Sequence, residues 1–212
     1  MKPDRDAASG SPIPEPRTTD DQPPIINIAG EKVALGPLHS GLIPLLVRWE
    51  NDFVTADLGG DEPRPRSPET VAAEFESLIA GKRHDWIGFA IYTLPDLACI
   101  GHTNIRDYQN SHRTAEFGIT IGDPQDRGKG YGTEATRLVL DFAFTVLGVH
   151  NVWLDTLAEN TAARRAYARA GFKEIGRRRE AHRRGPHLSD VILMDCLATE
   201  FAPPPKREPT RP

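Results

Sequence analysis

A predicted strand and a predicted helix are joined by Arg127-Gly128-Lys129-Gly130-Tyr131-Gly132. The strand before this turn covers 116–121, and the helix after it begins near Thr133. Glycine lets the backbone approach an anion closely, and the unpaired N–H groups of the first helical turn point at it. The stretch therefore predicts a turn that binds phosphate, with a plain glycine-rich surface turn as the alternative.

Two familiar phosphate-binding motifs do not fit this turn. A P-loop, Gly-x-x-x-x-Gly-Lys-Ser/Thr, would need a glycine at Asp123 and a hydroxyl at Gly130. The dinucleotide motif, Gly-x-Gly-x-x-Gly, would need its third glycine at Thr133. The pattern that is met is Arg/Gln-x-x-Gly-x-Gly/Ala, at Arg127, Gly130 and Gly132.

A second motif follows one helix and one strand later, and the two together carry a family resemblance. Its pattern is Asn-x-x-Ala-x-x-x-Tyr-x-x-x-Gly-Phe, met by Asn160, Ala163, Tyr167, Gly171 and Phe172. With both motifs, the chain resembles the GNAT superfamily of acyl-CoA-dependent N-acetyltransferases over about 25–201. Within it, 46–52, 100–101 and 190–194 are most similar to the RimJ/RimL type, which acetylates N-terminal amines of ribosomal proteins.

The resemblance implies the GNAT fold, a single α/β domain whose central, mixed, mostly antiparallel sheet is flanked by helices. It also implies acetyl-CoA as co-substrate, with its pyrophosphate on the N–H groups of the turn and its pantetheine arm along the preceding strand. A backbone N–H near Ile119 would donate to the oxyanion. The cofactor-binding residues expected on this basis are Ile119, Thr120, Ile121, Arg127, Gly128, Lys129, Gly130, Tyr131, Gly132, Thr133, Asn160, Ala163 and Tyr167.

The catalytic residues expected are Tyr167 and Glu116. The resemblance implies that Tyr167 is the general acid beside the thioester sulfur; its alternative is a core aromatic residue on an alanine-rich helix face. Glu116 begins the strand that leads to the turn, on the face opposite Phe117, and is expected to be the base; its alternative is a cross-strand ion pair. His102 and His112 are alternative bases. Because no histidine has metal-ligand spacing, no metal is expected.

Composition favours one soluble, cytoplasmic domain. The chain has 212 residues, 38% of them hydrophobic, and a net charge of −4, which argues against a dedicated nucleic-acid binder. No apolar run is long enough to span a membrane, and the first residues lack a secretory signal. Cys99 and Cys196 are expected as buried thiols. Of 19 prolines, 11 fall in 1–24 and 202–212, so both tails are predicted to be disordered around a folded unit at 25–201.

Periodicity and turn residues predict the remaining layout. Helices are expected at 43–49, from Ser67 as N-cap to Gly81, and at 160–170 with Asn160 as cap. The helix after the glycine turn is expected to pack on the sheet through Ala135, Leu138, Val139, Phe142 and Val146. Strands are expected at 33–37, 86–92, 98–106, 114–122 and 149–156, followed by a hairpin of 172–178 and 188–197.

The acceptor is an amine whose identity stays open between a protein N-terminus, a polyamine and an aminoglycoside. Acidic residues crowd 50–62, which favours a cationic acceptor, whereas 177–187 is strongly basic and is either an anion-binding patch or a solvated hairpin. A homodimer is a further expectation from the family. The rival to an enzyme is a non-catalytic module that binds acyl-CoA or associates with the ribosome on the same fold.

Overall fold

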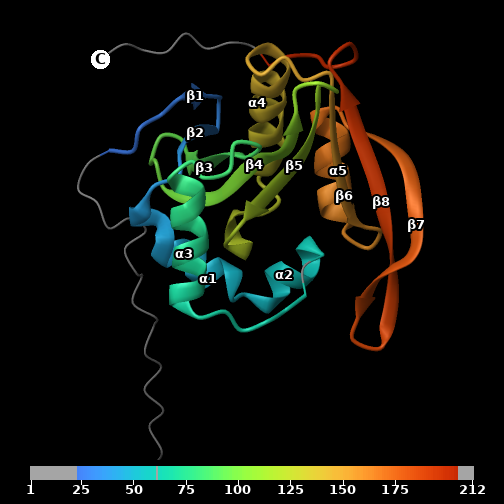
Figure 1. Cartoon of the computed structure of the whole chain (residues 1–212), viewed down its shortest axis with the longest axis horizontal. Helices are drawn as coiled ribbons and strands as arrows, with labels where there is room; N and C mark the ends of the chain where they lie inside the picture. The colour runs from blue at the N-terminus through green and yellow to red at the C-terminus, as the bar shows by residue number, and fades with distance from the viewer. Residues whose placement is uncertain (1–22, 61, 205–212) are drawn as a thin grey trace, which may run out of the picture.

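The computed structural model describes residues 23–60 and 62–204, so the predicted disorder of the tails lies almost wholly outside the described residues. Within them, one eight-stranded sheet has the order β1-β2-β3-β4-β5-β6-β8-β7 (Figure 1). Its strands are β1 (Ile28–Ala29), β2 (Val33–Pro37), β3 (Ile87–Thr93), β4 (Cys99–Gln109), β5 (Thr114–Ile121), β6 (Asn151–Leu157), β7 (Lys173–Arg184) and β8 (His187–Leu197). Neighbouring strands are antiparallel except β5 and β6, which confirms the mixed, mostly antiparallel sheet.

Five α-helices accompany this sheet in the described part of the chain: α1 (Ile43–Glu50), α2 (Phe53–Gly59), α3 (Pro68–Ile79), α4 (Tyr131–Thr145) and α5 (Thr161–Ala170). Ser67 caps α3 by accepting a hydrogen bond from the Thr70 N–H, as the sequence predicts. Helix α2 was not predicted, because Phe53 and Val54 are both exposed and leave no apolar stripe to recognise.

Two apolar clusters lie on the two faces of the sheet. One joins α4 to the strands through side chains such as Phe89, Ile105 and Val139. The other joins α1 and α3 to the opposite face through Trp49 and Phe75. The prediction that Val146 completes the packed stripe of α4 was wrong: Val146 is 67% exposed, because α4 ends at Thr145 and the chain turns toward β6.

The feature of the fold that positions a site is the separation of β5 from β6. Strand β5 runs to Ile121, yet it pairs with β6 only from Thr114 to Glu116. Beyond Glu116 the two strands part, while β5 keeps its pairing with β4 as far as Ile121. One edge of β5 is thus open just before the glycine turn, which leads directly into α4.

Candidate active site

The open edge of β5 presents main-chain groups in a known order. The Gly118 carbonyl accepts a hydrogen bond from Thr103 Oγ1 at 2.8 Å, so this carbonyl points toward β4. Because successive residues of a strand point their N–H and C=O groups to opposite edges, those of Ile119 face the open edge. The Ile121 carbonyl follows the same alternation, since it accepts from Arg127 Nε at 3.1 Å on that side.

The glycine turn is shaped for close approach by a ligand. Gly128 and Gly130 have φ values of 74° and 88°, in the left-handed region that side chains disfavour. Helix α4 begins at Tyr131, two residues before the predicted start, and its N-cap Gly130 has no side chain to satisfy the first N–H groups. A Cβ atom added at Gly128 would meet nothing within 4 Å. The turn therefore offers free N–H groups and open space at a helix N-terminus, which suits a phosphate group.

The two predicted cations of the turn, Lys129 and Arg127, both have hydrogen-bond partners within the protein. Lys129 Nζ lies 3.1 Å from Oδ1 of Asp126, a buried carboxylate that holds it beside the turn. The Arg127 guanidinium donates to main-chain carbonyls at the end of β5 and to the side chain of Thr55. Arg127 thus lies at the predicted place but faces the body of the protein as well as the turn.

Lys32 is a cation at the turn that sequence reasoning missed. It comes from the link between β1 and β2, and its Nζ lies 3.4 Å from the Lys129 carbonyl. Glu134, in the first turn of α4, holds this link in place: its Oε1 accepts from the Glu31 N–H and, at 3.0 Å, from the Lys32 N–H. These partners are about a hundred positions apart in sequence, so no local pattern could have revealed them.

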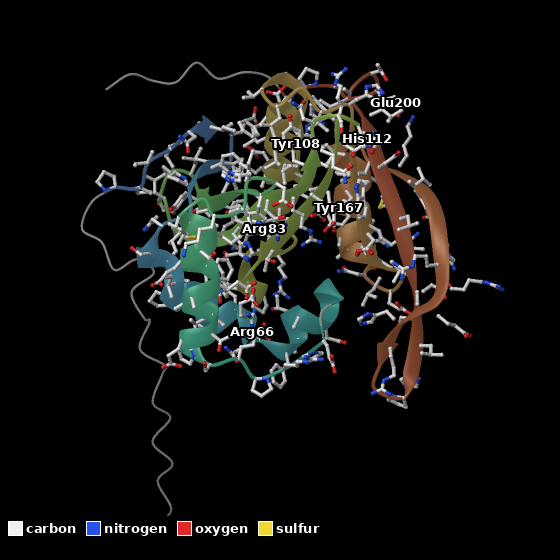
Figure 2. The ribbon with its side chains drawn as sticks, in the orientation of Figure 1. Arg66, Arg83, Tyr108, His112, Tyr167 and Glu200 are labelled. Carbon is white, nitrogen blue, oxygen red and sulfur yellow. The ribbon has the colours of Figure 1, made fainter. Side chains whose placement is uncertain are left out.

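The second motif forms the other side of the site. Asn160 caps α5 by accepting a hydrogen bond from the Ala163 N–H at 3.1 Å. Tyr167, two turns along α5, packs edge-on against Phe117 of β5 and against Phe172, with ring centroids 6.3 Å and 5.9 Å away. Figure 2 shows its label near the middle of the molecule. Burial, with a smaller contribution from the charge of Asp155, raises the pKa of Tyr167 to about 12, so its phenol stays protonated near neutral pH.

A single cleft of about 1330 Å³ joins these parts. All the predicted cofactor residues line it except Lys129 and Tyr131, and both predicted catalytic residues, Glu116 and Tyr167, line it as well. Its other wall comes from α1, α2, α3 and the segment between α2 and α3. The predicted cofactor groove and the wall made by the early helices are therefore parts of one continuous space.

Glu116 lies in the cleft as half of an ion pair. Its carboxylate accepts a hydrogen bond from the Arg106 guanidinium, directly across the β4–β5 pairing. The structure thus contains the cross-strand ion pair that was the alternative to a catalytic base. Glu116 is nearly buried and lines the cleft, so the base role stays a prediction.

The two histidines that were alternative bases have different surroundings. His102, on β4, is 9% exposed, lines the cleft and packs edge-on against Phe75, with ring centroids 5.6 Å apart. Burial lowers its pKa to about 4, so the imidazole is neutral near pH 7. His112 is exposed in the turn between β4 and β5 and is not among the cleft residues; Figure 2 places its label toward the upper edge of the molecule.

The buried His102 should make stability depend on pH. Because its pKa is lowered in the folded state, the unfolded chain binds the proton more readily below pH 6.5. Its contribution to the free energy of unfolding is full above pH 6.5 and decreases as the pH falls toward 4, by on the order of 3 kcal/mol. In His102→Leu, the free energy of unfolding, measured by urea denaturation at several pH values, should depend less on pH between 6.5 and 4. His112→Leu is the control, and equal slopes in wild type and His102→Leu would contradict the assignment.

The wall of the cleft made by α1, α3 and the segment before α3 carries charges of both signs. Arg66 donates to Glu50 at 2.7 Å and to Glu74, so it ties α1 to α3. Arg64 pairs with Glu62 in the segment before α3. Of the side chains that the structure describes, the basic hairpin of β7 and β8 contributes none to the lining of this cleft. It is partly neutralised as well, because Arg177 lies 3.1 Å from Asp190 and Arg178 lies 3.9 Å from Asp155.

The described residues contain neither a cluster of metal-ligating side chains nor a helix suited to a membrane. Between residues 23 and 204, leaving out 61, no group of three or more His, Cys, Asp or Glu side chains is arranged to hold a metal ion. Over the same residues, no helix has the length and apolar character needed to cross a membrane. The two cysteines, Cys99 and Cys196, are buried free thiols.

Comparison with known proteins adds a family and several relatives. The family model described as acetyltransferase (GNAT) domain matches residues 33–173. Spermidine N(1)-acetyltransferase of Vibrio cholerae is 32% identical over 102 residues, which are 48% of this chain and 58% of that protein. The enzyme of the same name from Escherichia coli K12 is 37% identical over 76 residues, 36% of this chain and 40% of that protein. The matches thus span about half the length of these curated relatives.

Solved structures resemble this chain over a larger share of its length. The structure of spermidine N-acetyltransferase from Vibrio cholerae in complex with CoA and spermine has a TM-score of 0.72 and 25% identity, and the match covers 79% of this chain and 96% of that one. A GNAT-family acetyltransferase from Bacillus anthracis has a TM-score of 0.70 at 18% identity, over 82% of this chain and 99% of that one. The predicted GNAT fold is confirmed.

Proposed function

The chain belongs to the acetyltransferase (GNAT) family, and from this we propose that it is an enzyme that transfers an acetyl group from acetyl-CoA to a primary amine. The open edge of β5, which ends at the glycine turn, is the observation that carries the proposal. An acyl-CoA has an amide-bearing arm that can pair with a strand edge and a diphosphate that suits a helix N-terminus. In this chain the open edge of β5 ends at Ile121, and the glycine turn begins only a few residues later, at Arg127.

The residues of the cleft supply what direct attack in a ternary complex requires. The amine nitrogen forms a bond to the thioester carbon, which gives a tetrahedral intermediate with a negatively charged oxygen. The C–S bond then breaks, and the CoA thiolate leaves. The Ile119 N–H at the open edge of β5 is placed to donate to that oxyanion. Tyr167, which lines the cleft beside β5, would give its proton to the departing thiolate.

A base must also take the proton that the amine loses. We assign this to Glu116, directly or through water, because its carboxylate lines the cleft at the point where β5 and β6 part. Arg106 holds this carboxylate in one position. His102 is the weaker choice, since a pKa of about 4 makes its imidazole a poor proton acceptor near neutral pH.

For the acceptor we propose a small cationic amine of the polyamine type. The support comes from the spermidine N-acetyltransferases among the relatives and from the carboxylates on the wall made by α1, α3 and the segment before α3, which are Glu50, Glu62 and Glu74. The two curated relatives named above are spermidine N(1)-acetyltransferases, so they give no support to the finer resemblance to the RimJ/RimL type. A protein N-terminus stays the second acceptor, favoured by the arginines that neutralise Glu50, Glu62 and Glu74.

Two further proposals concern the setting of the reaction. A homodimer, or a larger assembly, is supported by a relative that is described as dodecameric. A reducing, cytoplasmic setting is supported by the two buried free thiols.

An acceptor screen tests the proposed activity. Thiol release from acetyl-CoA would be followed with spermidine and spermine, with peptides that have free N-termini, and with aminoglycosides. We expect the polyamines to raise release well above hydrolysis. If acetyl-CoA binds but no amine raises its cleavage, the chain is the non-catalytic acyl-CoA-binding module, and the enzymatic proposal is wrong.

A further inference from the structure

The guanidinium of Arg127 bridges two elements that border the cleft. Its Nε donates to the Ile121 carbonyl at 3.1 Å, and one terminal nitrogen donates to the Gly122 carbonyl at 2.8 Å. The same terminal nitrogen donates to Thr55 Oγ1 of α2 at 2.6 Å. Because the guanidinium is planar and rigid, these bonds fix α2 relative to the end of β5 in one geometry.

Helix α2 packs beside α1 and β6, but it has few apolar side chains that could hold it there. It has seven residues, and short helices are marginal without tertiary contacts. Of the α2 side chains whose burial the structure describes, none is buried; Phe53 and Val54 are 46% and 64% exposed. The helix is capped at both ends, by Asp52 and by Gly60, but caps set its length and do not anchor it to the domain.

The Thr55 hydroxyl continues the connection to a carboxylate. It accepts from Arg127 and donates to Asp52, so a cation and an anion are linked through one hydroxyl group. The hydrogen bond from Thr55 is the largest of the effects that lower the pKa of Asp52, which shows that the bond favours the charged form of this carboxylate. A hydroxyl between two charged groups makes stronger hydrogen bonds than one between neutral groups.

The helix held in this way forms part of the acceptor wall. Thr55, Ala56 and Gly59 line the cleft on the side away from α4, facing the space that also reaches Glu116 and Tyr167. Arg127 itself comes from the start of the glycine turn, on the cofactor side. The bridge therefore runs from the region that would hold acetyl-CoA to the wall that would hold the amine.

We propose that Arg127 is a positioning residue for the acceptor site, which holds α2 against the end of β5 through the Thr55 hydroxyl. Its main effect is then on the binding of the amine, and the cofactor is held by the main chain of the turn. This rests on the proposed acetyltransferase function, in which the two walls of the cleft have these separate roles.

Thr55→Val is the sharpest kinetic test, because it keeps the side-chain shape and removes only the hydroxyl. We expect the KM for the amine to rise about tenfold, the loss expected for one charge-assisted hydrogen bond. The Kd for acetyl-CoA and kcat at saturating amine should change little. Thr55→Ser should restore the wild-type KM, because it returns the hydroxyl to the same place.

Arg127→Met completes the comparison. If Arg127 acts through Thr55, the increases in amine KM caused by Arg127→Met and Thr55→Val should not multiply when the two are combined. Increases in amine KM that multiply would show that Arg127 does not act through Thr55, and they would overturn the proposal. A normal amine KM in Thr55→Val, together with weakened acetyl-CoA binding in Arg127→Met, would overturn it as well and would identify Arg127 as a phosphate ligand.

Hydrogen exchange gives a readout that does not require turnover. In Thr55→Val, the amides of 54–59 should exchange about tenfold faster, because the helix opens locally more often. Thr145→Val, which removes a threonine hydroxyl at the far end of α4, is the control and should leave α2 protected. Unchanged exchange in α2 would refute the bridge even if the enzyme is active, whereas a failed acceptor screen with faster exchange would refute only the enzymatic role.

Discussion

Gly130→Val should abolish the binding of acetyl-CoA without unfolding the protein. Gly130 is the N-cap of α4 and has a φ of 88°, so its neighbours' N–H groups are aimed at the open side of the turn. A valine there would put methyl groups into the space where the diphosphate is expected, close to Lys32 Nζ, which lies 3.4 Å from the position of an added Cβ. Loss of two or more hydrogen bonds to a charged ligand, each about 1.5–3 kcal/mol, predicts a Kd at least 100-fold higher.

A matched control separates lost binding from backbone strain. Valine in the left-handed region costs on the order of 1–3 kcal/mol wherever it is placed. Gly148 has a φ of 69° and no atom within 4 Å of an added Cβ, and it lies beyond the opposite end of α4. Gly148→Val should therefore lose similar thermal stability while it binds acetyl-CoA normally in calorimetry. Equal affinity in Gly130→Val and wild type would show that the turn does not hold the cofactor.

Tyr167→Phe should lower kcat by about 10²-fold, the typical contribution of a positioned general acid. The substitution removes only the phenolic oxygen, so the contacts of the ring with Phe117 and Phe172 should persist. With a pKa raised to about 12, the phenol of Tyr167 carries its proton throughout the neutral range. The Kd for acetyl-CoA should stay within a few-fold of wild type, because the ring still packs in place.

Tyr108→Phe is the control for this experiment. Tyr108 donates its hydroxyl proton to the Leu147 carbonyl at 3.0 Å and is not among the cleft residues, so its loss should affect stability more than turnover. If Tyr167→Phe retains full activity, Tyr167 is a packing residue of α5, and another group must protonate the thiolate.

The order of elements around the site follows from short-range patterns. Glycines at 128, 130 and 132 between an alternating strand and an amphipathic helix predicted the turn, and Ser67 and Asn160 were recognised as caps. Each of these features is decided by residues within about four positions of one another. The turn and the caps can be predicted because local sterics and hydrogen bonds favour them whatever the surrounding tertiary structure.

The features that sequence reasoning missed depend on contacts between distant segments. Lys32 reaches the turn only because Glu134 holds the β1–β2 link, and Arg127 faces α2 only because Thr55 lies beside it. The partner of Glu116 could be recognised as Arg106 only once the β4–β5 register was known, since a shift of one residue would reverse the faces. Helix α2 was not predicted because Phe53 and Val54 are exposed and leave no apolar stripe in the sequence.

The most direct measurement is a crystal structure of the protein with CoA and spermidine. We predict that the diphosphate lies on the main-chain N–H groups of 128–133 and that the pantetheine arm follows the β5 edge at Ile119 and Ile121. The sulfur should then lie within reach of the Tyr167 hydroxyl, with an amine between it and Glu116. A complex in which the glycine turn is empty and CoA is bound elsewhere would show that this turn is not the cofactor site.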